Sequence, residues 1–377
     1  MTRLRRSLPL LALLALDGCS EPSAAPANGP AAAPAPAAAK VTTPAPPLDL
    51  PGRLIFLAED EGSAALVSLR GADRRDLLRG TGLYPAAVDP RGAALAVISV
   101  DEQGGQHREH IEVRPLGDDG LGAPIWTSEA ATHVRNPSWG PEGRFLVFEA
   151  AFTSFRDIYK VELPAGTLTR LTDNTEGNFE PAVSPDGRSL AFVSSRDGNA
   201  EVYRMTIDGR EPTRLTNYPL DDWGPMWAPD GQRLAFLSNR ELVDRIYLMG
   251  LDGGEQRRLT ADRNPVKDPD AALGDEPHET DPAFAPDGAA IAYCVRTGSQ
   301  GAALRIAPLG GGQAVQISDG SVSDRSPVWS PDGAHLVFVS NRDGGDLELY
   351  GVPRGGGEPS RLTRREGPDW LPRWAPR

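Results

Sequence analysis

The sequence is poor in residue types that build most metal and disulfide sites. Among 377 residues there are two cysteines and five histidines. The histidines show no spacing typical of metal ligands. Cys19 lies in an N-terminal signal region and Cys294 in a predicted strand, so we expect no disulfide between them. We predict that Cys294 is a small buried apolar residue.

An excess of positive charge is also missing. Lysine and arginine number 39, against 52 aspartate and glutamate, which gives a net charge of −13. A nucleic-acid-binding surface would need a basic stripe, so we expect no nucleic-acid partner. The chain also lacks Gly-x-Ser-x-Gly, His-Glu-x-x-His, Gly-x-x-x-x-Gly-Lys-Ser/Thr and Cys-x-x-Cys motifs. These absences favour a protein that binds without catalysis and has no resident cofactor.

The N-terminus is predicted to be an export signal, residues 1–19. Arg3, Arg5 and Arg6 precede a short apolar run that is too short to span a bilayer. Leu16-Asp17-Gly18-Cys19 then resembles a bacterial lipobox, which implies lipidation of Cys19. Asp17 departs from the small neutral residue usual there. The alternative is an ordinary secretory signal in which Cys19 is incidental.

Residues 20–50 are dominated by alanine and proline and show no apolar periodicity. Such a segment buries too little surface to offset its ordering entropy. We predict an extended, disordered tether. The resemblance to a lipobox implies the periplasmic side of the outer membrane, with contact to the membrane through the lipid anchor only.

Residues 51–377 contain an internal repeat. A Pro-x-aromatic-x-Pro-Asp-Gly phrase recurs, as in Pro225–Gly231 and Pro327–Gly333. The first prolines of the units are at positions 85, 137, 181, 225, 282, 327 and 372. The period of about 45 residues is the length of a four-stranded propeller blade. We predict an all-β propeller of seven blades, or six if the degraded unit at Pro85 is not a blade.

The two ends of the chain complete each other. Residues 54–62 align with the second strand and following turn of the unit at Pro181, in which we predict strands over 190–194, 202–207 and 213–216. The N-terminus therefore supplies strands two to four of a blade, and the unit at Pro372 supplies only a first strand. Pairing them would close the ring without a free sheet edge.

The repeat Pro-x-Trp-Ser-Pro-Asp-Gly, followed by Leu-Ala-Phe-x-Ser-x-Arg-Asp-Gly and a Leu-Thr ending, resembles the TolB-type propeller repeat. The resemblance runs from Leu54 to Pro376. This motif is specific to the propeller fold and much less specific to any function. TolB-type proteins carry an α/β domain before the propeller, whereas only the predicted tether precedes Leu54 in this sequence.

We predict candidate site residues on one face of the ring. Loops entering each first strand and turns between second and third strands share this face, called here the top face; the Pro-Asp-Gly turns lie on the bottom face. Acids three residues before the first prolines are Asp222, Glu279, Asp324 and Asp369, with Asn178 in the same slot. Arginines of the Ser-x-Arg turns are Arg196, Arg240 and Arg342.

Two interpretations of these residues stay open. Each arginine could pair with an acid and fasten the blades, since residues invariant within repeats usually serve the repeat. Alternatively, the acids could form a ring at the mouth of the central channel that binds a basic peptide end or a cation. Oxygen ligands alone would favour Ca²⁺.

Two insertions are expected on the top face. The loop over residues 261–281 is rich in acids and longer than its equivalents. We predict that it contacts a partner. The stretch from Val100 to His110 is a second insertion.

The leading hypothesis is a monomeric envelope lipoprotein whose top face binds a protein or peptide. The rival is a propeller hydrolase or lyase acting on polysaccharide or peptide, which predicts acids, His, Tyr or Arg converging at the channel mouth. A third option is a structural lipoprotein without a specific ligand.

Overall fold

The computed structural model describes residues 48–375 apart from 49, 61–62, 81, 104–105, 261–276, 298–300 and 365–366. The regular structure in this part of the chain is entirely β. It contains no helix long and apolar enough to cross a membrane. The predicted signal with Cys19, and the predicted tether up to residue 47, lie outside the described residues.

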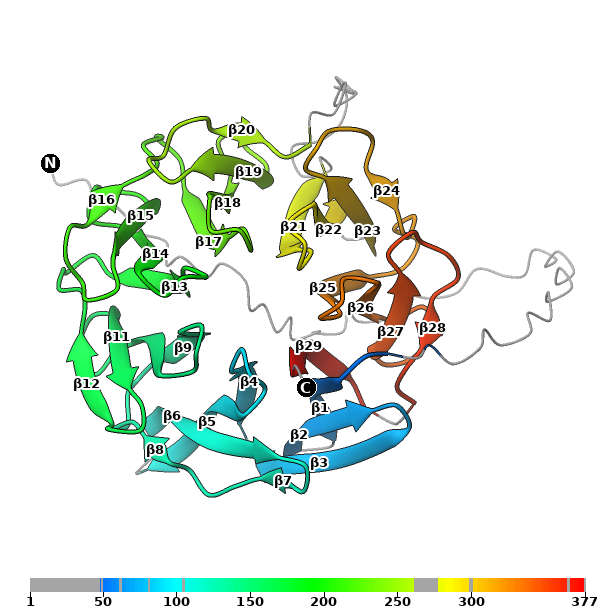
Figure 1. The fold of residues 1–377 in the computed structure, drawn as a ribbon, viewed down its shortest axis with the longest axis horizontal. Coiled ribbons are helices and arrows are strands. Elements are labelled where there is room, and N and C mark those ends of the chain that lie inside the picture. The colour runs from blue at the N-terminus through cyan, green and yellow to red at the C-terminus, as the bar shows by residue number, and fades with distance from the viewer. Residues whose placement is uncertain are drawn as a thin grey trace, which may run out of the picture. The chain divides into compact units, whose positions relative to one another are not determined.

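The strands form seven antiparallel sheets arranged as the blades of a ring (Figure 1). Blade 1 contains β29 (Asp369–Ala375), β1 (Arg53–Asp60), β2 (Ser63–Arg70) and β3 (Asp73–Gly80). Blade 2 contains β4 (Leu83–Val88), β5 (Ala94–Gln103), β6 (Gln106–Gly117), β7 (Gly120–Leu121) and β8 (Trp126–Thr127). Blade 3 contains β9 (Val134–Trp139), β10 (Phe145–Ala150), β11 (Asp157–Glu162) and β12 (Thr167–Arg170).

The remaining four blades keep the same order from the centre to the rim. Blade 4 contains β13 (Asn178–Val183), β14 (Ser189–Ser194), β15 (Glu201–Thr206) and β16 (Thr213–Arg214). Blade 5 contains β17 (Asp222–Trp227), β18 (Arg233–Ser238), β19 (Arg245–Gly250) and β20 (Arg257–Arg258). Blade 6 contains β21 (His278–Phe284), β22 (Ala290–Thr297), β23 (Gly301–Pro308) and β24 (Val315–Gln316). Blade 7 contains β25 (Asp324–Trp329), β26 (His335–Ser340), β27 (Glu348–Pro353) and β28 (Ser360–Arg361).

The predicted seven blades and the predicted ring closure are both confirmed. The degraded unit at Pro85 forms a complete blade, whose outer strand is split into β7 and β8, both paired with β6. At the seam, β1 pairs with β29, with Leu54 opposite Trp374 and Ala58 opposite Asp369. The N-terminal strands therefore share a sheet with the C-terminal strand.

The hydrophobic core lies between neighbouring blades. The second strands are nearly continuous apolar runs, as in β14, because both faces of each sheet are covered. Val147 and Ile158 of blade 3 pack with Leu190, Phe192 and Tyr203 of blade 4 in one buried cluster. Buried Cys294 belongs to a similar cluster between blades 6 and 7, as predicted.

The aromatic residue of the repeat has a specific inter-blade role. The indole Nε1 of Trp227 donates to the Ala182 carbonyl of the preceding blade at 2.9 Å. Trp139 and Trp329 donate in the same way, each at 3.0 Å, to Ala87 and Ala283. A buried indole N–H is costly without a partner, so a tryptophan in this slot both fills the gap between blades and joins them.

Each first strand is interrupted where its proline occurs. The pairing with the second strand shifts register there, which marks a β-bulge. In six of the seven first strands the residue before the proline has a positive φ. These residues are Asn136, Glu180, Gly224, Asp281, Ser326 and Leu371. The first strands are also the innermost ones (Figure 1), so the bulges surround the axis of the ring.

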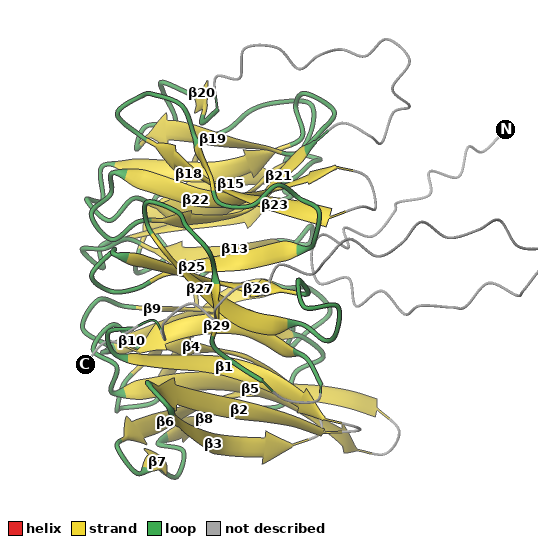
Figure 2. Ribbon diagram, turned by 90° about the vertical axis from the view of Figure 1, so that its right-hand side faces the viewer, coloured by secondary structure: helices red, strands yellow, loops and turns green. Residues whose placement is uncertain are grey.

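In side view the strands run from one face of the ring to the other, and their turns gather at the two faces (Figure 2). The bottom-face turns between first and second strands are alike in five blades, with φ between +62° and +69° at Gly143, Gly187, Gly231, Gly288 and Gly333. Glycine adopts this backbone without a steric cost. The top-face turns differ from blade to blade.

Candidate functional site

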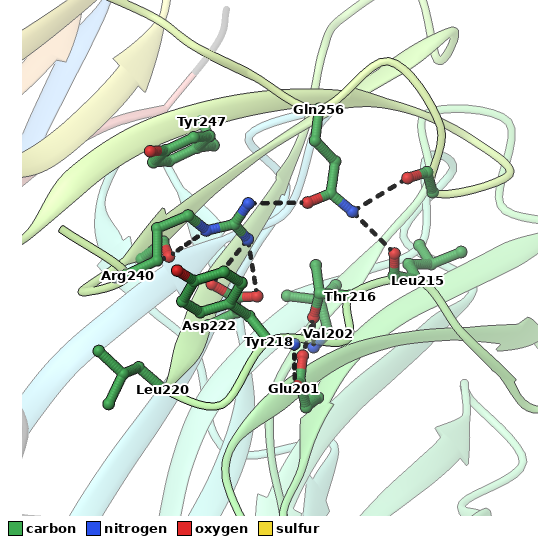
Figure 3. A network of polar contacts seen from close by, with 12 residues as sticks. Glu201, Val202, Leu215, Thr216, Tyr218, Leu220, Asp222, Arg240, Tyr247 and Gln256 are labelled. Atoms are coloured by element: carbon green, nitrogen blue, oxygen red, sulfur yellow. Dashed lines mark hydrogen bonds and ion pairs between the residues drawn. The ribbon is translucent and has the colours of Figure 1, made fainter.

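The predicted acid Asp222 and arginine Arg240 form one buried ion pair (Figure 3). Asp222 is fully buried at the start of β17, and Arg240 follows the end of β18 in the same blade. Arg240 Nη2 donates to both carboxylate oxygens, at 3.0 and 2.9 Å, while Nε donates to Ser238 Oγ at 2.8 Å. Burial raises the pKa of the Asp222 carboxyl, and the Ser238 hydroxyl and Arg240 oppose that shift.

Arg240 also connects blade 5 to blade 4. Its Nη1 donates to Gln256 Oε1 at 3.0 Å, and Gln256 Nε2 donates to the Leu215 carbonyl at 3.1 Å. The guanidinium lies 4.4 Å from the Tyr247 ring centroid and 5.1 Å from that of Tyr218 (Figure 3). Aromatic faces attract a cation in this geometry. The predicted pair is thus enclosed in a polar and aromatic network.

The other predicted pairs follow this pattern in part. Arg342 Nη2 donates to both oxygens of buried Asp324 at 3.0 Å. Arg196 Nη2 donates to Asn178 Oδ1 at 3.2 Å. Asp369 is buried at the start of β29. Its blade has Ala58-Glu59-Asp60 where blades 4, 5 and 7 have Ser-x-Arg.

Glu279 does not follow the pattern. Its Oε2 accepts the Ile246 N–H of the preceding blade at 2.9 Å, and its Oε1 accepts the Thr260 hydroxyl. The equivalent threonines elsewhere bind an acid of their own third strand, as Thr216 binds Glu201 and Thr363 binds Glu348. In blade 5 that third-strand position is Arg245. Glu279 of blade 6 therefore supplies the carboxylate that the third strand of blade 5 lacks.

A ring of these acids that binds Ca²⁺ stays a prediction. Asp222, Asp324 and Glu279 are each engaged by partners within or beside their own blades. Across the part of the chain that the structure describes, no group of three or more Asp, Glu, His or Cys side chains is arranged to hold a metal. Asp222 and Asp324 are bound by an arginine of their own blade, whereas Glu279 is bound by the backbone and threonine of blade 5.

A second polar cluster lies where blade 3 meets blade 4. Glu149 of β10 is 2% exposed and accepts four hydrogen bonds. His133 Nε2 lies 2.8 Å from Oε1, and Arg156 Nη1 lies 3.5 Å from it. Asn136 Nδ2 and the Glu180 backbone N–H donate to Oε2 at 3.1 and 2.6 Å. These donors lower the pKa of Glu149 against the effect of its burial.

Glu180 is the second carboxyl of this cluster, and its pKa is shifted upward. Desolvation and the nearby Glu149 charge raise its pKa to about 7, although the Gly224 N–H donates to its Oε2 at 2.7 Å. His133 and Arg156 keep 27% and 34% of their side chains exposed. Arg156 also lies 4.2 Å from the Phe179 ring centroid. A carboxyl whose pKa is raised to about 7, beside a partly exposed histidine and a partly exposed arginine, can bind a polar ligand or transfer a proton.

Further charged residues occupy the first strands next to this cluster and across the ring. Arg135 of β9 pairs with buried Glu109 and lies 3.8 Å from the Tyr84 ring centroid. On β29, Arg373 is solvent-exposed, yet the surrounding protein lowers the pKa of its guanidinium, an effect that the Asp281 carboxylate opposes. The inner strands thus present both signs of charge.

Sequence reasoning missed the Glu149–Glu180 cluster, although a signal was present. Glu149 occupies a second-strand slot that holds Val193 in blade 4, Leu237 in blade 5 and Val339 in blade 7. An acid in a repeated apolar slot marks a local departure from the repeat. The search for candidates followed residues shared by the units and therefore passed over this one.

The two predicted insertions have different outcomes. The stretch from Val100 to His110 extends β5 and β6, which pair as far as Gln103 opposite Gln106. It is therefore a long hairpin on the top face. Residues 261–276 of the acidic loop lie outside the described residues, and its last residues begin β21, where His278 Nδ1 lies 3.0 Å from Asp244 Oδ2.

The comparisons with known proteins agree with this architecture. A family model described as a TolB β-propeller domain matches residues 97–276. The TolB of Acinetobacter baumannii is 20% identical, with a TM-score of 0.54 over 85% of this chain and 82% of that one. No curated protein matches the sequence. This chain therefore has a TolB-like β-propeller fold.

Enzymes share the same fold. An oligogalacturonate lyase solved in complex with manganese is 16% identical, with a TM-score of 0.57 over 85% of this chain and 87% of that one. A prolyl endopeptidase is 14% identical, with a TM-score of 0.65 over 87% of this chain and 50% of that one. Similarity at these identities identifies the fold and does not distinguish a binding protein from an enzyme.

Proposed function

We propose that this protein is a binding module of the bacterial cell envelope whose top face recognises a protein partner. The observation that carries the proposal is the contrast between the two faces. The bottom-face turns between first and second strands repeat one backbone geometry in five blades, whereas the top face carries the β5–β6 hairpin and has closely similar turns only in blades 4, 5 and 7. Variable loops on a rigid scaffold are where recognition residues concentrate.

The hairpin offers a direct test. Four pairs, from Val100 opposite Glu109 to Gln103 opposite Gln106, extend beyond Ser99 opposite His110. Replacing residues 101–108 by Asn-Gly would close a short hairpin at Val100 and Glu109. We expect this variant to melt like the unaltered protein but to lose partner proteins that co-purify with the tagged full-length chain from envelope extracts.

The matched control is the bottom-face double substitution Arg210→Ala and Glu211→Ala, which should leave co-purification unchanged. The proposal is wrong if no partner co-purifies, or if the bottom-face variant loses the partner while the short hairpin keeps it.

The proposed location is tested separately. If Cys19 carries the lipid anchor, Cys19→Ala should move the protein from the membrane to the soluble fraction. Retention of that variant in the membrane fraction would refute lipid anchoring at Cys19.

The Glu149–Glu180 cluster supports a second candidate, a hydrolase or lyase acting on polysaccharide or peptide. It brings Glu180 of the inner strand β13, whose pKa is raised to about 7, together with a histidine that precedes β9 and an arginine that precedes β11. Such convergence is what an enzyme requires. Turnover in a panel of glycans and peptides, abolished by Glu180→Gln and kept by Glu211→Gln, would establish it. Absence of turnover across the panel would leave the binding function as the better account.

A further inference from the structure

In the top-face turn of blade 5, a leucine stands where the equivalent turns of blades 4 and 7 have glycine. In blades 4 and 7 the turn after the second strand is Arg196-Asp197-Gly198 and Arg342-Asp343-Gly344, and both glycines have positive φ, +105° and +73°. Blade 5 has Arg240-Glu241-Leu242, and Leu242 takes the same place with φ +66°.

The three turns are otherwise equivalent. The Leu242 N–H donates to the Asn239 carbonyl at 2.7 Å, as Gly198 donates to Ser195 and Gly344 to Asn341, both at 3.0 Å. A side chain with a Cβ is strained in this left-handed region, which glycine enters freely. Blade 5 therefore keeps a strained leucine where the repeat has a glycine.

Leu242 is also the most exposed large hydrophobic residue of the described part of the chain, at 73%. A single exposed leucine is ordinary on a protein surface. Here the exposure is combined with backbone strain, and no packing within the fold offsets that strain. Strain of this kind is retained mainly at functional sites.

The support beneath Leu242 is rigid. On one side, Arg240 is held by Asp222, Ser238 and Gln256, as described above. On the other, Glu241 accepts the Tyr247 hydroxyl at 2.5 Å and pairs with Arg258 at 3.3 Å. An apolar side chain presented on a preorganised turn loses little entropy when a partner covers it.

The surroundings define the partner's chemistry. Tyr218, whose ring lies beside Arg240, is 40% exposed. Glu241 and, in the neighbouring turn, Asp197 keep 38% and 39% of their side chains exposed. Asp173, in the loop that leads into blade 4, is 83% exposed. These carboxylates stay partly open to a basic partner although each also pairs with an arginine, Arg258, Arg214 or Arg170, and the protein carries a net charge of −13.

We infer that Leu242 is the apolar anchor of the partner-binding face, and that it inserts into an apolar pocket of a protein segment rimmed by lysine or arginine. This inference rests on the proposed binding function and names the contact that carries it. Large apolar residues at the centre of an interface, surrounded by polar contacts, supply most of its affinity.

The test uses the full-length protein and a displayed library of random linear peptides as the probe. Peptides selected on the unaltered protein should be enriched in bulky apolar residues next to lysine or arginine, and should bind more weakly at high salt. Their affinity should fall by more than about tenfold for Leu242→Gly, while Leu242→Met and the distant exposed-residue control Val315→Ser should keep it.

The melting temperature distinguishes a loss of peptide affinity from misfolding of the Leu242→Gly variant. Because glycine relieves the strained backbone, Leu242→Gly should raise the Tm by about 2–4 °C. Selected peptides that bind Leu242→Gly within twofold of the unaltered protein would overturn the anchor and leave the binding function intact. Failure to select any peptide, together with no co-purifying partner, would overturn both.

Discussion

Arg240 donates through a single nitrogen, Nη2, to both carboxylate oxygens of Asp222, whose side chain is fully buried. The same two-oxygen contact joins Arg342 to Asp324 two blades further on. This relationship makes the acids part of the architecture, and it has a measurable consequence for stability.

Replacing Asp222 by alanine leaves the Arg240 guanidinium, 13% exposed, without its carboxylate. Breaking a buried ion pair from one side costs about 3–5 kcal/mol, so the midpoint of urea unfolding should fall strongly. The exposed control Glu211→Ala should change little. In a double-mutant cycle, Asp222→Ala with Arg240→Ala should cost less than the sum of the single changes. Strict additivity would contradict the pairing.

A second prediction concerns Glu180 and pH. Its folded-state pKa of about 7 exceeds its usual 4.5, so the folded state holds the proton more tightly than the unfolded chain. The stabilisation is present below pH 4.5 and is lost as the pH rises through 7. Glu180→Gln should therefore be more stable than the unaltered protein at pH 8, by up to about 3 kcal/mol, and equal to it near pH 4. Denaturant titrations at both pH values measure this difference, and an equal effect at both would contradict the assignment.

A third prediction addresses the threonine network. Thr216, Thr260 and Thr363 each donate a buried hydroxyl to Glu201, Glu279 or Glu348. Substitution by valine keeps the shape but removes the donor, at a cost of about 1–3 kcal/mol in each case. Thr213→Val, on the exposed strand β16, serves as the control. If Thr260→Val is neutral, Glu279 does not replace a third-strand acid in blade 5.

A fourth prediction tests ring closure. A chain that ends at Pro368 lacks β29, so the inner edge of β1 has no partner for its backbone groups. We expect the cooperative thermal transition to be lost and the protein to associate through the open edge. A chain that ends at Ala375 keeps every residue of β29 and should melt like the full-length protein. Circular dichroism and size-exclusion chromatography distinguish the two, and a stable monomer ending at Pro368 would contradict the seam.

The architecture was predictable because it depends on a repeat. The spacing of the prolines predicted seven blades, with six as the alternative, and the complementary ends predicted that the C-terminal strand pairs with the N-terminal strands, as β29 and β1 do. Strand bounds were close: residues 190–194 and 202–207 were predicted, and Ser189–Ser194 and Glu201–Thr206 are observed. The split outer strand of blade 2 was not predicted, because it follows no repeated pattern.

The site was less predictable, since residues shared by every unit mostly serve the fold. Asp222 and Arg240 stood out in the sequence for that reason, and the structure uses them to stabilise a blade. Glu149 and Leu242 each depart from a repeated slot, one apolar and one glycine. Their neighbours, such as Glu180 beside Glu149, become visible only once adjacent blades are in place.

The bend before each inner-strand proline has a consequence for how this fold diversifies. The same left-handed backbone accommodates asparagine, glutamate, glycine, aspartate, serine and leucine in six successive positions around the ring. The bend is therefore kept whichever residue stands there, although every residue other than glycine bears the strain of the left-handed backbone. A new ligand preference could evolve there through single substitutions, one blade at a time, without any repacking of the sheets behind them.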